Sequence, residues 1–495
     1  MRKFSLAIDQ GTTSCRAILF DNTGMVIGVS QKEFNQIYPQ PGYVEHDPYE
    51  ILNSQIECIK NVILNNNIDA HAISCVGITN QRETCLIWDK ITGKPIANAI
   101  VWQCRRTASQ IDNLVQFTSV IRNKTGLIPD AYFSASKIAW LLDNIPDAQN
   151  LANSGNLIFG TIDTWLIYNL TYDRNLFTEP SNASRTLLFN IHTLKWDTDL
   201  FEIFNIPLIM APTVVDSNAN FGHTNKSLLG FEAPILAVLG DQQSALFGQG
   251  CLDSGHVKCT YGTGSFVLVN LDNQIIIKDG LLTSVAWKLA DVSPCYALEG
   301  ANFIAGAIIK WLIQELKILP NPSESEKIAN SVDNNGGVYF IPAFVGLGSP
   351  WWRQDIRGII YGLTRGTNQA HIIRASLEAM AYQVNDIINK FSCHNLVLKD
   401  LRVDGAASNN NFLLQLQADL ANIPVIKAKT TESTAWGVAA LAFLTCGEIK
   451  NIDAYKQLWQ SSKSFIPKNH NLAEYQKWKY LVEQMLKIDW NPMLN

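Results

Sequence analysis

The first hydrophobic residues of the chain fall into short runs that predict strands joined by tight turns. Residues 6–21, LAIDQGTTSCRAILFD, place an apolar run on each side of a small-residue turn, and a third run, MVIGVS, follows soon after. A meander of this kind lacks the helix that a Rossmann unit places after its first glycine turn. Residues 256–270, HVKCTYGTGSFVLVN, repeat the layout half a chain later, which predicts two similar domains that face each other.

Apolar residues at helical spacing follow both copies of this hairpin. They occur in residues 46–63, 134–144, 303–316 and 371–391. Residues 73–79, ISCVGIT, have the pattern of a buried strand, and strand and helix patterns alternate between residues 401 and 444. The alternation predicts an α/β fold, with the boundary between its two halves near residues 250–256.

Composition narrows the class of ligand. The 495 residues are too many for a single core, and 39 Lys plus Arg nearly balance 44 Asp plus Glu, giving a net charge of -5. Neither sign runs in blocks, which speaks against a nucleic-acid surface and favours a small ligand. The ten cysteines form no Cys-x-x-Cys pair, and no apolar stretch approaches the roughly 18 residues that a membrane span needs. We therefore expect a cytoplasmic protein with reduced thiols and no stable membrane insertion.

Two carboxylates stand at the ends of predicted strands. Asp9 precedes the turn Gly11–Ser14, whose amides and hydroxyls could donate to a phosphate while Asp9 holds a hydrated Mg2+. A plain polar hairpin turn fits these residues equally well. Asp241 lies at the end of a strand, where α/β sheets bind ligands, although it could simply cap the next helix. The chain has neither G-x-G-x-x-G nor a Walker A loop, so a polyphosphate would lie between Gly11–Ser14 and its counterpart Gly262–Gly264.

Other candidate residues have two interpretations each. Arg82 and Glu83 follow a strand; such neighbours are most often a solvated surface pair, but a bend would let both reach one ligand. Trp102 and Tyr132 would by default be core aromatics. In residues 402–412, RVDGAASNNNF, the small residues would let a flat base lie against the backbone, or they form a capped turn between strand and helix.

A series of segments resembles the FGGY family of carbohydrate kinases, and in particular its members that phosphorylate glycerol. They run in order through residues 5–445 and include IDQGTTS, GITNQRET, AIVWQCRRT, GDQQSALFGQ, TYGTGSF and YALEGANFIAGA. The resemblance implies an actin-like ATPase fold, with two ribonuclease-H-like lobes around a central cleft. It implies an N-terminal FGGY lobe for polyol and phosphate at residues 1–250 and a C-terminal FGGY lobe for the nucleotide at residues 256–446. Residues 447–495 would form a C-terminal helical extension.

The resemblance also implies transfer of the γ-phosphoryl group of ATP to a terminal hydroxyl of glycerol, giving sn-glycerol 3-phosphate. Asp241 would be the catalytic base, and Asp9 and Asp241 would lie beside Mg2+. The residues implied around the polyol are Arg82, Glu83, Trp102, Tyr132, Asp241, Gln242 and Phe266. Those implied around ATP are Thr12, Thr13, Ser14, Arg16, Thr263, Gly306, Lys310, Ala406 and Asn410. A homo-oligomer, a dimer or tetramer, is expected.

The chain departs from the family pattern in three places. Ala406 stands where the family has glycine and Lys310 where it usually has glutamine. The added methyl group can crowd the nucleotide and the amine can add a phosphate contact, and we expect ATP use to survive both. Residues 225–234, NKSLLGFEAP, lack the arginine of a family loop that binds fructose 1,6-bisphosphate in some members, so inhibition by that sugar phosphate is not expected.

Two other functions fit parts of the pattern. A kinase of the same fold could act on another polyol or sugar, such as xylulose or gluconate. An actin-like or chaperone-like ATP switch would bind a protein partner and would need no polyol pocket. Arg82 and Glu83 with Trp102 and Tyr132 favour glycerol over other sugars, and Asp241 together with the aromatic set speaks against the switch.

Overall fold

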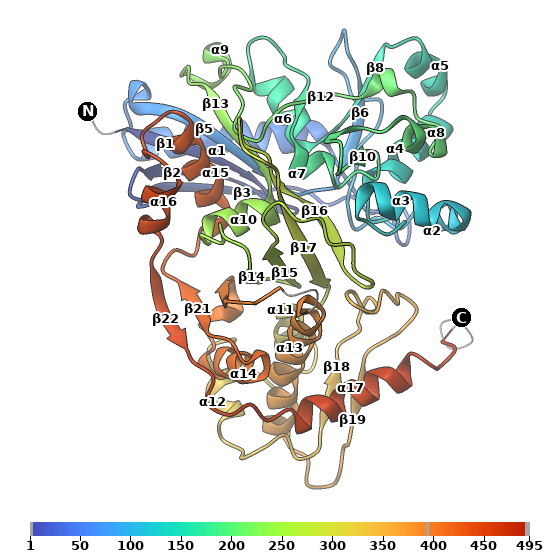
Figure 1. The fold of residues 1–495 in the computed structure, drawn as a ribbon, viewed down its shortest axis with the longest axis vertical. Coiled ribbons are helices and arrows are strands. Elements are labelled where there is room, and N and C mark those ends of the chain that lie inside the picture. The colour runs from blue at the N-terminus through green and yellow to red at the C-terminus, as the bar shows by residue number, and fades with distance from the viewer. Residues whose placement is uncertain (1–2, 393–395, 491–495) are drawn as a thin grey trace.

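The computed structural model describes residues 3–392 and 396–490, and it has two lobes that are each built on a β-sheet (Figure 1). The N-terminal lobe, blue to green, lies above most of the C-terminal lobe, while part of the red segment reaches up beside the first sheet. The first sheet has the strand order β13-β5-β1-β2-β3 and the second β16-β17-β15-β14-β20-β21-β22. The prediction of an α/β fold with two lobes is confirmed.

The N-terminal sheet combines an antiparallel meander with two parallel strands. The meander is β1 (Phe4–Gln10), β2 (Ser14–Asp21) and β3 (Val26–Glu33). The parallel strands are β5 (Ile73–Asn80) and β13 (Ile235–Gly240). The long helix α1 (Pro48–Asn65) packs against β2 and β3. The pairing brings the ends of β1, β5 and β13 to one edge of the sheet.

Shorter elements complete this lobe. A second sheet contains β4 (Glu45–His46), β7 (Ala99–Ile100), β6 (Cys85–Asp89) and β8 (Leu157–Thr161). Two-stranded pairs are formed by β9 (Phe177–Thr178) with β12 (Thr213–Val214) and by β10 (Phe189–Asn190) with β11 (Lys195–Trp196). The helices are α2 (Ala108–Asp112), α3 (Thr118–Thr125), α4 (Ser134–Asn144), α5 (Ala148–Asn153), α6 (Ile162–Leu170), α7 (Pro180–Ala183), α8 (Thr198–Ile203) and α9 (Lys226–Leu229).

The C-terminal lobe repeats the hairpin of the first. Its sheet strands are β14 (His256–Tyr261), β15 (Ser265–Asn270), β16 (Leu282–Trp287), β17 (Cys295–Asn302), β20 (Asp400–Asp404), β21 (Val425–Ala428) and β22 (Ser461–Phe465), and β18 (Tyr339–Ile341) pairs with β19 (Ile359–Tyr361) outside it. The remaining helices of the chain are α10 (Asp241–Gly248), α11 (Gly306–Gln314), α12 (Glu324–Ala329), α13 (Gln369–Phe391), α14 (Asn411–Ala421), α15 (Ser433–Thr445), α16 (Ile452–Leu458) and α17 (Ala473–Met485).

The two predicted hairpins are antiparallel pairs, each closed by a backbone hydrogen bond from a glycine amide. In the first, the amide of Gly11 donates to the carbonyl of Ser14 at 3.0 Å; in the second, Gly262 donates to Gly264 at 2.9 Å. A Cβ at Gly264 would lie 2.4 Å from the carbonyl oxygen of Asn302, so only glycine fits this position. The repeat predicted from the sequence is thus present in both sheets.

A shared hydrophobic core joins the lobes. Helices α10 and α15 pack against each other so closely that a Cβ at Gly437 would lie 2.0 Å from the carbonyl oxygen of Ser244. Helix α15 also packs on β1, β5 and β13, although its sequence belongs to the second half of the chain. Apolar side chains from both sheets meet these helices: Ala7, Ile18, Leu239, Leu268, Ala286 and Ala297. The halves of the chain are therefore interleaved.

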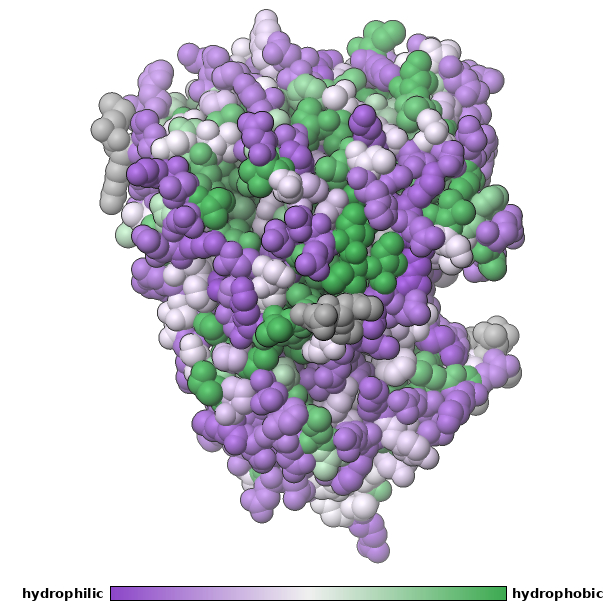
Figure 2. All heavy atoms as spheres, in the orientation of Figure 1, coloured by the Kyte–Doolittle hydropathy of each residue, from purple (hydrophilic) through white to green (hydrophobic). Residues whose placement is uncertain are grey.

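The segment at residues 447–495, predicted to be a helical extension, also contains a strand. Between α16 and α17, β22 pairs antiparallel with β21 and forms an edge of the C-terminal sheet. In the described part of the chain, no helix combines the length and apolar character that crossing a membrane requires. The face in Figure 2 is mostly hydrophilic, with hydrophobic residues gathered near its middle.

Candidate active site

Three neighbouring strands of the N-terminal sheet deliver charged residues to the same edge. Asp9 is the residue before the last of β1, and Asp241 directly follows β13. Arg82 and Glu83 follow β5, which lies between β1 and β13 in the sheet. In the sheet register, Asn80 of β5 pairs with both Gln10 and Gly240. The predicted acids therefore meet at the carboxyl end of a sheet, which is where α/β proteins bind their ligands.

Arg82 and Glu83 are not a surface pair, so that interpretation of the sequence is wrong. Only 2% of each side chain is exposed. Glu83 adopts the left-handed conformation with a φ of 60°, and the amide of Thr84 donates to the carbonyl of Arg82 at 2.6 Å. This is the bend that lets two successive side chains face the same site.

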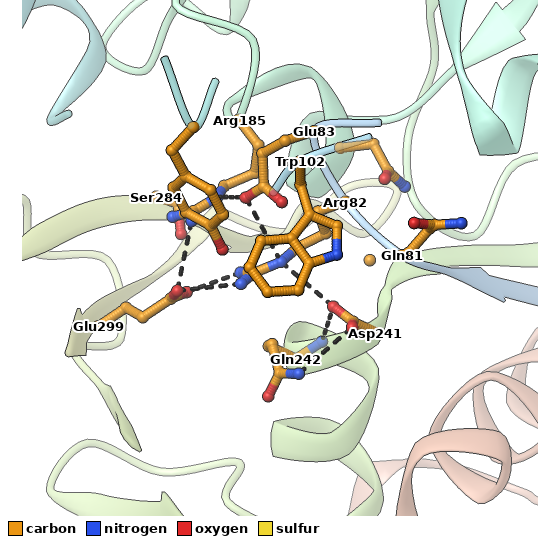
Figure 3. A network of polar contacts seen from close by, with 12 residues as sticks. Gln81, Arg82, Glu83, Trp102, Arg185, Asp241, Gln242, Ser284 and Glu299 are labelled. Carbon is orange, nitrogen blue, oxygen red and sulfur yellow. Dashed lines mark hydrogen bonds and ion pairs between the residues drawn. The ribbon is translucent and has the colours of Figure 1, made fainter. Parts of the chain in front are cut away.

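A buried ionic network holds these two residues (Figure 3). Glu299 of β17 accepts hydrogen bonds from Nη1 and Nη2 of Arg82 at 2.6 and 2.9 Å. Arg185 donates to Glu83 at 2.5 Å and to Glu299 at 3.3 Å. Burial alone would raise the pKa of Glu299, but the two guanidinium groups outweigh it and lower that pKa to about 2. Each buried charge thus has a partner.

Asp241 has the surroundings of a partly accessible base. Its carboxylate lies 3.2 Å from Nε of Arg82, accepts from the amide of Gln242 at 2.7 Å, and is 31% exposed. Lys258 donates to the side chain of Gln242 at 2.5 Å. Burial raises the pKa of Asp241 above its usual value, and the charges of Arg82 and Lys258 limit the rise. Gly240, not Asp241, is the residue that precedes helix α10 as its cap.

Three aromatic rings from different parts of the fold meet beside this carboxylate. The rings of Trp102 and Tyr132 are 5.6 Å apart and nearly perpendicular, and Phe266 of β15 lies 6.5 Å from Trp102. In Figure 3 the indole of Trp102 lies directly in front of Arg82, with Asp241 and Gln242 below it. The seven residues predicted around the polyol thus form two contact groups. The ionic group contains Arg82, Glu83 and Asp241, and Gln242 joins it through a hydrogen bond to Asp241. The aromatic group contains Trp102, Tyr132 and Phe266.

The predicted phosphate turn is tied to the same group. Thr12 and Thr13 lie in the turn between β1 and β2, and Ser14 begins β2. The hydroxyl of Thr12 accepts a hydrogen bond of 2.9 Å from the indole nitrogen of Trp102. Gln36 donates to the carbonyl of Thr12 at 3.0 Å. A bond donated to the hydroxyl oxygen leaves the hydroxyl hydrogen free to donate elsewhere. The turn can therefore offer donors to an anion.

Arg16, on β2, bridges the lobes. It donates to Asp9 and, at 2.7 Å, to Glu432 at the start of α15. Within the described residues there is no cluster of three acidic, His or Cys side chains around which a metal could be bound. Asp9 and Asp241 provide hard oxygen donors at one sheet edge, and this small set suits Mg2+, which usually takes one or two carboxylates and completes its shell with water and phosphates.

A cavity of about 540 Å³ lies in the C-terminal lobe, at the start of α11 and beside the loop before α14. Four of the residues predicted around the nucleotide line it: Gly306, Lys310, Ala406 and Asn410. Thr263 is next to this group, since its carbonyl accepts from the amides of Ala305 and Ala307 at the beginning of α11. The structure therefore brings these five residues together at one cavity large enough for a small ligand, whereas Thr12, Thr13, Ser14 and Arg16 lie at the β1–β2 hairpin of the other lobe.

Sequence reasoning missed several charged residues of the site. Glu299, Arg185 and Lys258 are fully buried beside the predicted residues, and Lys137 donates to the carbonyls of Ala131, Tyr132 and Phe133 at 2.6, 2.6 and 3.0 Å. The segment YALEGANFIAGA, which contains Glu299, was part of the family resemblance, but nothing in its spacing pointed to Arg82.

A cavity of about 540 Å³ in one lobe and a carboxylate beside aromatic rings in the other are features of a two-lobed phosphotransferase. Models of the FGGY family of carbohydrate kinases match residues 4–248 with the N-terminal domain and residues 257–446 with the C-terminal domain. The chain belongs to this family and is an enzyme, so the family and the kinase class predicted from the sequence are confirmed.

Relatives with high identity extend over almost the whole chain. It is 50% identical over 491 residues to the glycerol kinase of Pseudothermotoga lettingae, covering 98% of both chains. The structure of Plasmodium falciparum glycerol kinase with ADP is 37% identical, with a TM-score of 0.92 over 99% of each chain. The xylulose kinase of Lactobacillus acidophilus, at 22% identity and a TM-score of 0.89 over 99% of this chain and 100% of that one, shares the fold.

Proposed function

We propose that this protein transfers the γ-phosphoryl group of ATP to a terminal hydroxyl of glycerol. The observation that carries the proposal is the contact of Asp241 with the buried Arg82 beside the rings of Trp102 and Tyr132. Relatives that are about half identical to the chain over nearly its full length are named glycerol kinases, whereas the similar xylulose and gluconate kinases are 22% identical.

The chemistry follows from these neighbours. Carboxylate and guanidinium groups bind vicinal hydroxyls, and aromatic faces cover the carbon chain of a small polyol. Asp241 accepts the proton of the attacking hydroxyl as its oxygen bonds to the γ-phosphorus, while the bond from that phosphorus to the β-phosphate oxygen breaks and ADP leaves. The raised pKa makes Asp241 a better proton acceptor than an exposed aspartate.

Phosphoryl transfer requires hydrogen-bond donors and positive charge around the phosphoryl oxygens more than it requires covalent catalysis by the protein. The turn at Thr12, Thr13 and Ser14 and the guanidinium of Arg16 take up charge on the phosphoryl oxygens. When bound, Mg2+ neutralises phosphate charge, and Asp9 and Asp241 would hold it. The base and ribose of ATP would occupy the cavity lined by Gly306, Lys310, Ala406 and Asn410.

Water must be kept from the γ-phosphate, since it would otherwise replace the polyol as acceptor. The two lobes are therefore expected to close on their substrates, which small-angle scattering with glycerol and a nonhydrolysable ATP analogue would record as compaction. Assembly as a dimer or tetramer, a cytoplasmic location and insensitivity to fructose 1,6-bisphosphate stay predictions. Residues 225–234 contain the short helix α9, which is capped at its C-terminal end by Gly230 with a φ of 85°.

The test is ADP release by the purified protein with Mg-ATP, comparing glycerol, xylulose, gluconate, erythritol and no acceptor. We expect turnover with glycerol alone, and a loss of about 100-fold or more in the Asp241→Asn variant with ADP binding retained. Turnover with another acceptor would keep the mechanism and change the substrate. Hydrolysis without an acceptor that Asp241→Asn leaves unchanged would contradict the proposal and favour an ATP-driven switch.

A further inference from the structure

Glu299 contacts both Arg82 and Arg185, the two arginines that pair with the acids Asp241 and Glu83 of the predicted polyol site. Its carboxylate receives two hydrogen bonds from Arg82 and one from Arg185, and these arginines lie 3.2 Å from Asp241 and 2.5 Å from Glu83, respectively. Glu299 itself is completely buried on β17 of the C-terminal sheet. It is therefore one side chain away from both acids without lying next to either (Figure 3).

The geometry of Arg82 shows what this contact does. A guanidinium has five N–H donors in a rigid planar fork. The end of the fork, Nη1 and Nη2, donates to Glu299, and Nη1 also donates to Gln243 at 3.1 Å. The side edge is formed by Nε and the remaining N–H of Nη2, and Nε makes ion pairs with the carboxylates of Asp241 at 3.2 Å and Glu83 at 3.8 Å.

We propose that Glu299 is a positioning residue of the acceptor site: by holding the end of the Arg82 fork, it presents the side edge to Asp241 and to the hydroxyl that reacts there. Through Arg185 it fixes Glu83 in the same way. This role rests on the proposed function of the site and adds to it a residue that touches neither the base nor the acceptor.

Glu299 also contributes negative charge near the base. The charged groups around Asp241 are Arg82 and Lys258, and behind them lie Arg185, Glu83, Glu299 and Asp404. Removing the carboxylate of Glu299 takes one negative charge from this group, which stabilises ionised Asp241 and makes it a weaker base.

The experiment compares three variants with the unchanged protein. Glu299→Gln removes the charge at constant size, and Glu299→Asp keeps the charge but draws the carboxylate back by one methylene. Glu378→Gln is the matched control, because Glu378 is also nearly buried and pairs with Arg374 at 2.9 Å in helix α13, away from the site. Each is measured for kcat and KM with glycerol, for the pH dependence of kcat/KM, for the Kd of ADP and for thermal unfolding.

We expect Glu299→Gln to lower kcat/KM for glycerol by about 100-fold, the scale of a small misplacement in an active site, with the Kd of ADP unchanged. The acid limb of its pH profile moves to lower pH, a change that general loss of structure does not produce. Glu299→Asp recovers part of the rate, and Glu378→Gln keeps the activity of the unchanged protein.

Three results would overturn the proposal. In one, Glu299→Gln keeps kcat/KM and its acid limb. In the second, both Glu299 variants lose ADP binding and activity together, as expected of a purely structural residue. If Glu299→Gln does not fold, Glu299→Asp decides, and a kcat and KM for glycerol equal to those of the unchanged protein count against us. Should the unchanged protein not use glycerol, the proposed substrate is wrong, and the variants are compared with the acceptor that it does use.

Discussion

The indole nitrogen of Trp102 donates a hydrogen bond of 2.9 Å to the hydroxyl of Thr12. Trp102 belongs to the aromatic group at the predicted polyol site, and Thr12 belongs to the turn predicted to bind phosphate. One bond thus connects the places where the two substrates are expected to meet. A contact of this kind can align acceptor and donor before any chemistry takes place.

Trp102→Phe tests this connection, because it removes the indole N–H while keeping an aromatic face. We expect kcat/KM to fall about tenfold for glycerol and also for ATP, the scale of one lost hydrogen bond. Steady-state kinetics with each substrate varied in turn would show it. Trp140→Phe is the control, since Trp140 contacts Tyr43 and Arg106 outside the site. A loss confined to glycerol would mean that the bond to Thr12 has no role in phosphate binding.

Lys137 fixes the loop that carries Tyr132. Its ammonium group donates to three successive carbonyls, and burial lowers its pKa to about 8. Lys137→Met leaves those carbonyls without their donor, so we expect the free energy of unfolding to fall by about 3 kcal/mol or more and the KM for glycerol to rise. Urea denaturation and steady-state kinetics measure the two effects. An unchanged KM would show that Tyr132 keeps its place without the lysine.

The same lysine gives a pH dependence of defined sign. Between pH 8 and 10.5 the unfolded chain binds a proton at Lys137 that the folded protein has lost. Stability rises with pH where the unfolded state binds more protons, so this group adds about 3 kcal/mol to the free energy of unfolding across that window. The contribution disappears in Lys137→Met. We expect the difference in stability between the two proteins to be larger at pH 10 than at pH 8.

The KM for ATP should change in opposite directions when Arg16 and its partner Glu432 are substituted. Glu432 holds one end of its guanidinium at 2.7 Å, so a phosphate that binds Arg16 must compete with Glu432. Glu432→Gln is expected to lower the KM for ATP by up to about fivefold, the scale of a partly exposed ion pair, and Arg16→Gln to raise it. Glu448→Gln, which breaks the surface pair with Lys3, is the control. A change of the KM for ATP in the same direction in both variants would mean that Arg16 does not bind ATP.

Lys310 lines the nucleotide cavity, where the family resemblance implies a glutamine. Its side chain is exposed, so any attraction to phosphate is screened by salt. We expect Lys310→Gln to weaken ADP binding at low ionic strength and to leave it unchanged at about 0.5 M salt. Calorimetric titration at both ionic strengths measures this. Lys327→Gln, on the neighbouring α12, is the comparison, and an equal effect there would mean a general surface charge effect.

Local pattern predicted the elements of this fold better than their contacts. The two hairpins and the long helix α13 each have a strong periodic pattern, and each pattern is formed by residues that are close together in the sequence. Strand β22 was missed because its sequence, SSKSF, is polar and mostly exposed at a sheet edge, so that no hydrophobic face marks it.

The candidate site was predictable where its residues stand in recognisable segments, such as Asp241 and the turn at Thr12. The partners of those residues were not. Arg82 lies 217 residues from Glu299 in the chain, and Arg185 lies 102 residues from Glu83. Spacing along the sequence carries no information about such pairs. Adjacency suggested an exposed pair of Arg82 with Glu83, but both side chains are buried, and the hydrogen bonds of Arg82 go to Glu299 and Gln243. Only the folded chain shows which charges neutralise each other.

The position of helix α15 has a consequence for folding during synthesis. It covers β1, β5 and β13, yet the ribosome makes it long after those strands have emerged. At translation rates of about 5–20 residues per second, the nascent sheet waits on the order of 10 s or longer with that face uncovered. A growing chain of this protein therefore depends on other factors, or on a temporary cover from its own residues, until its last eighth is made.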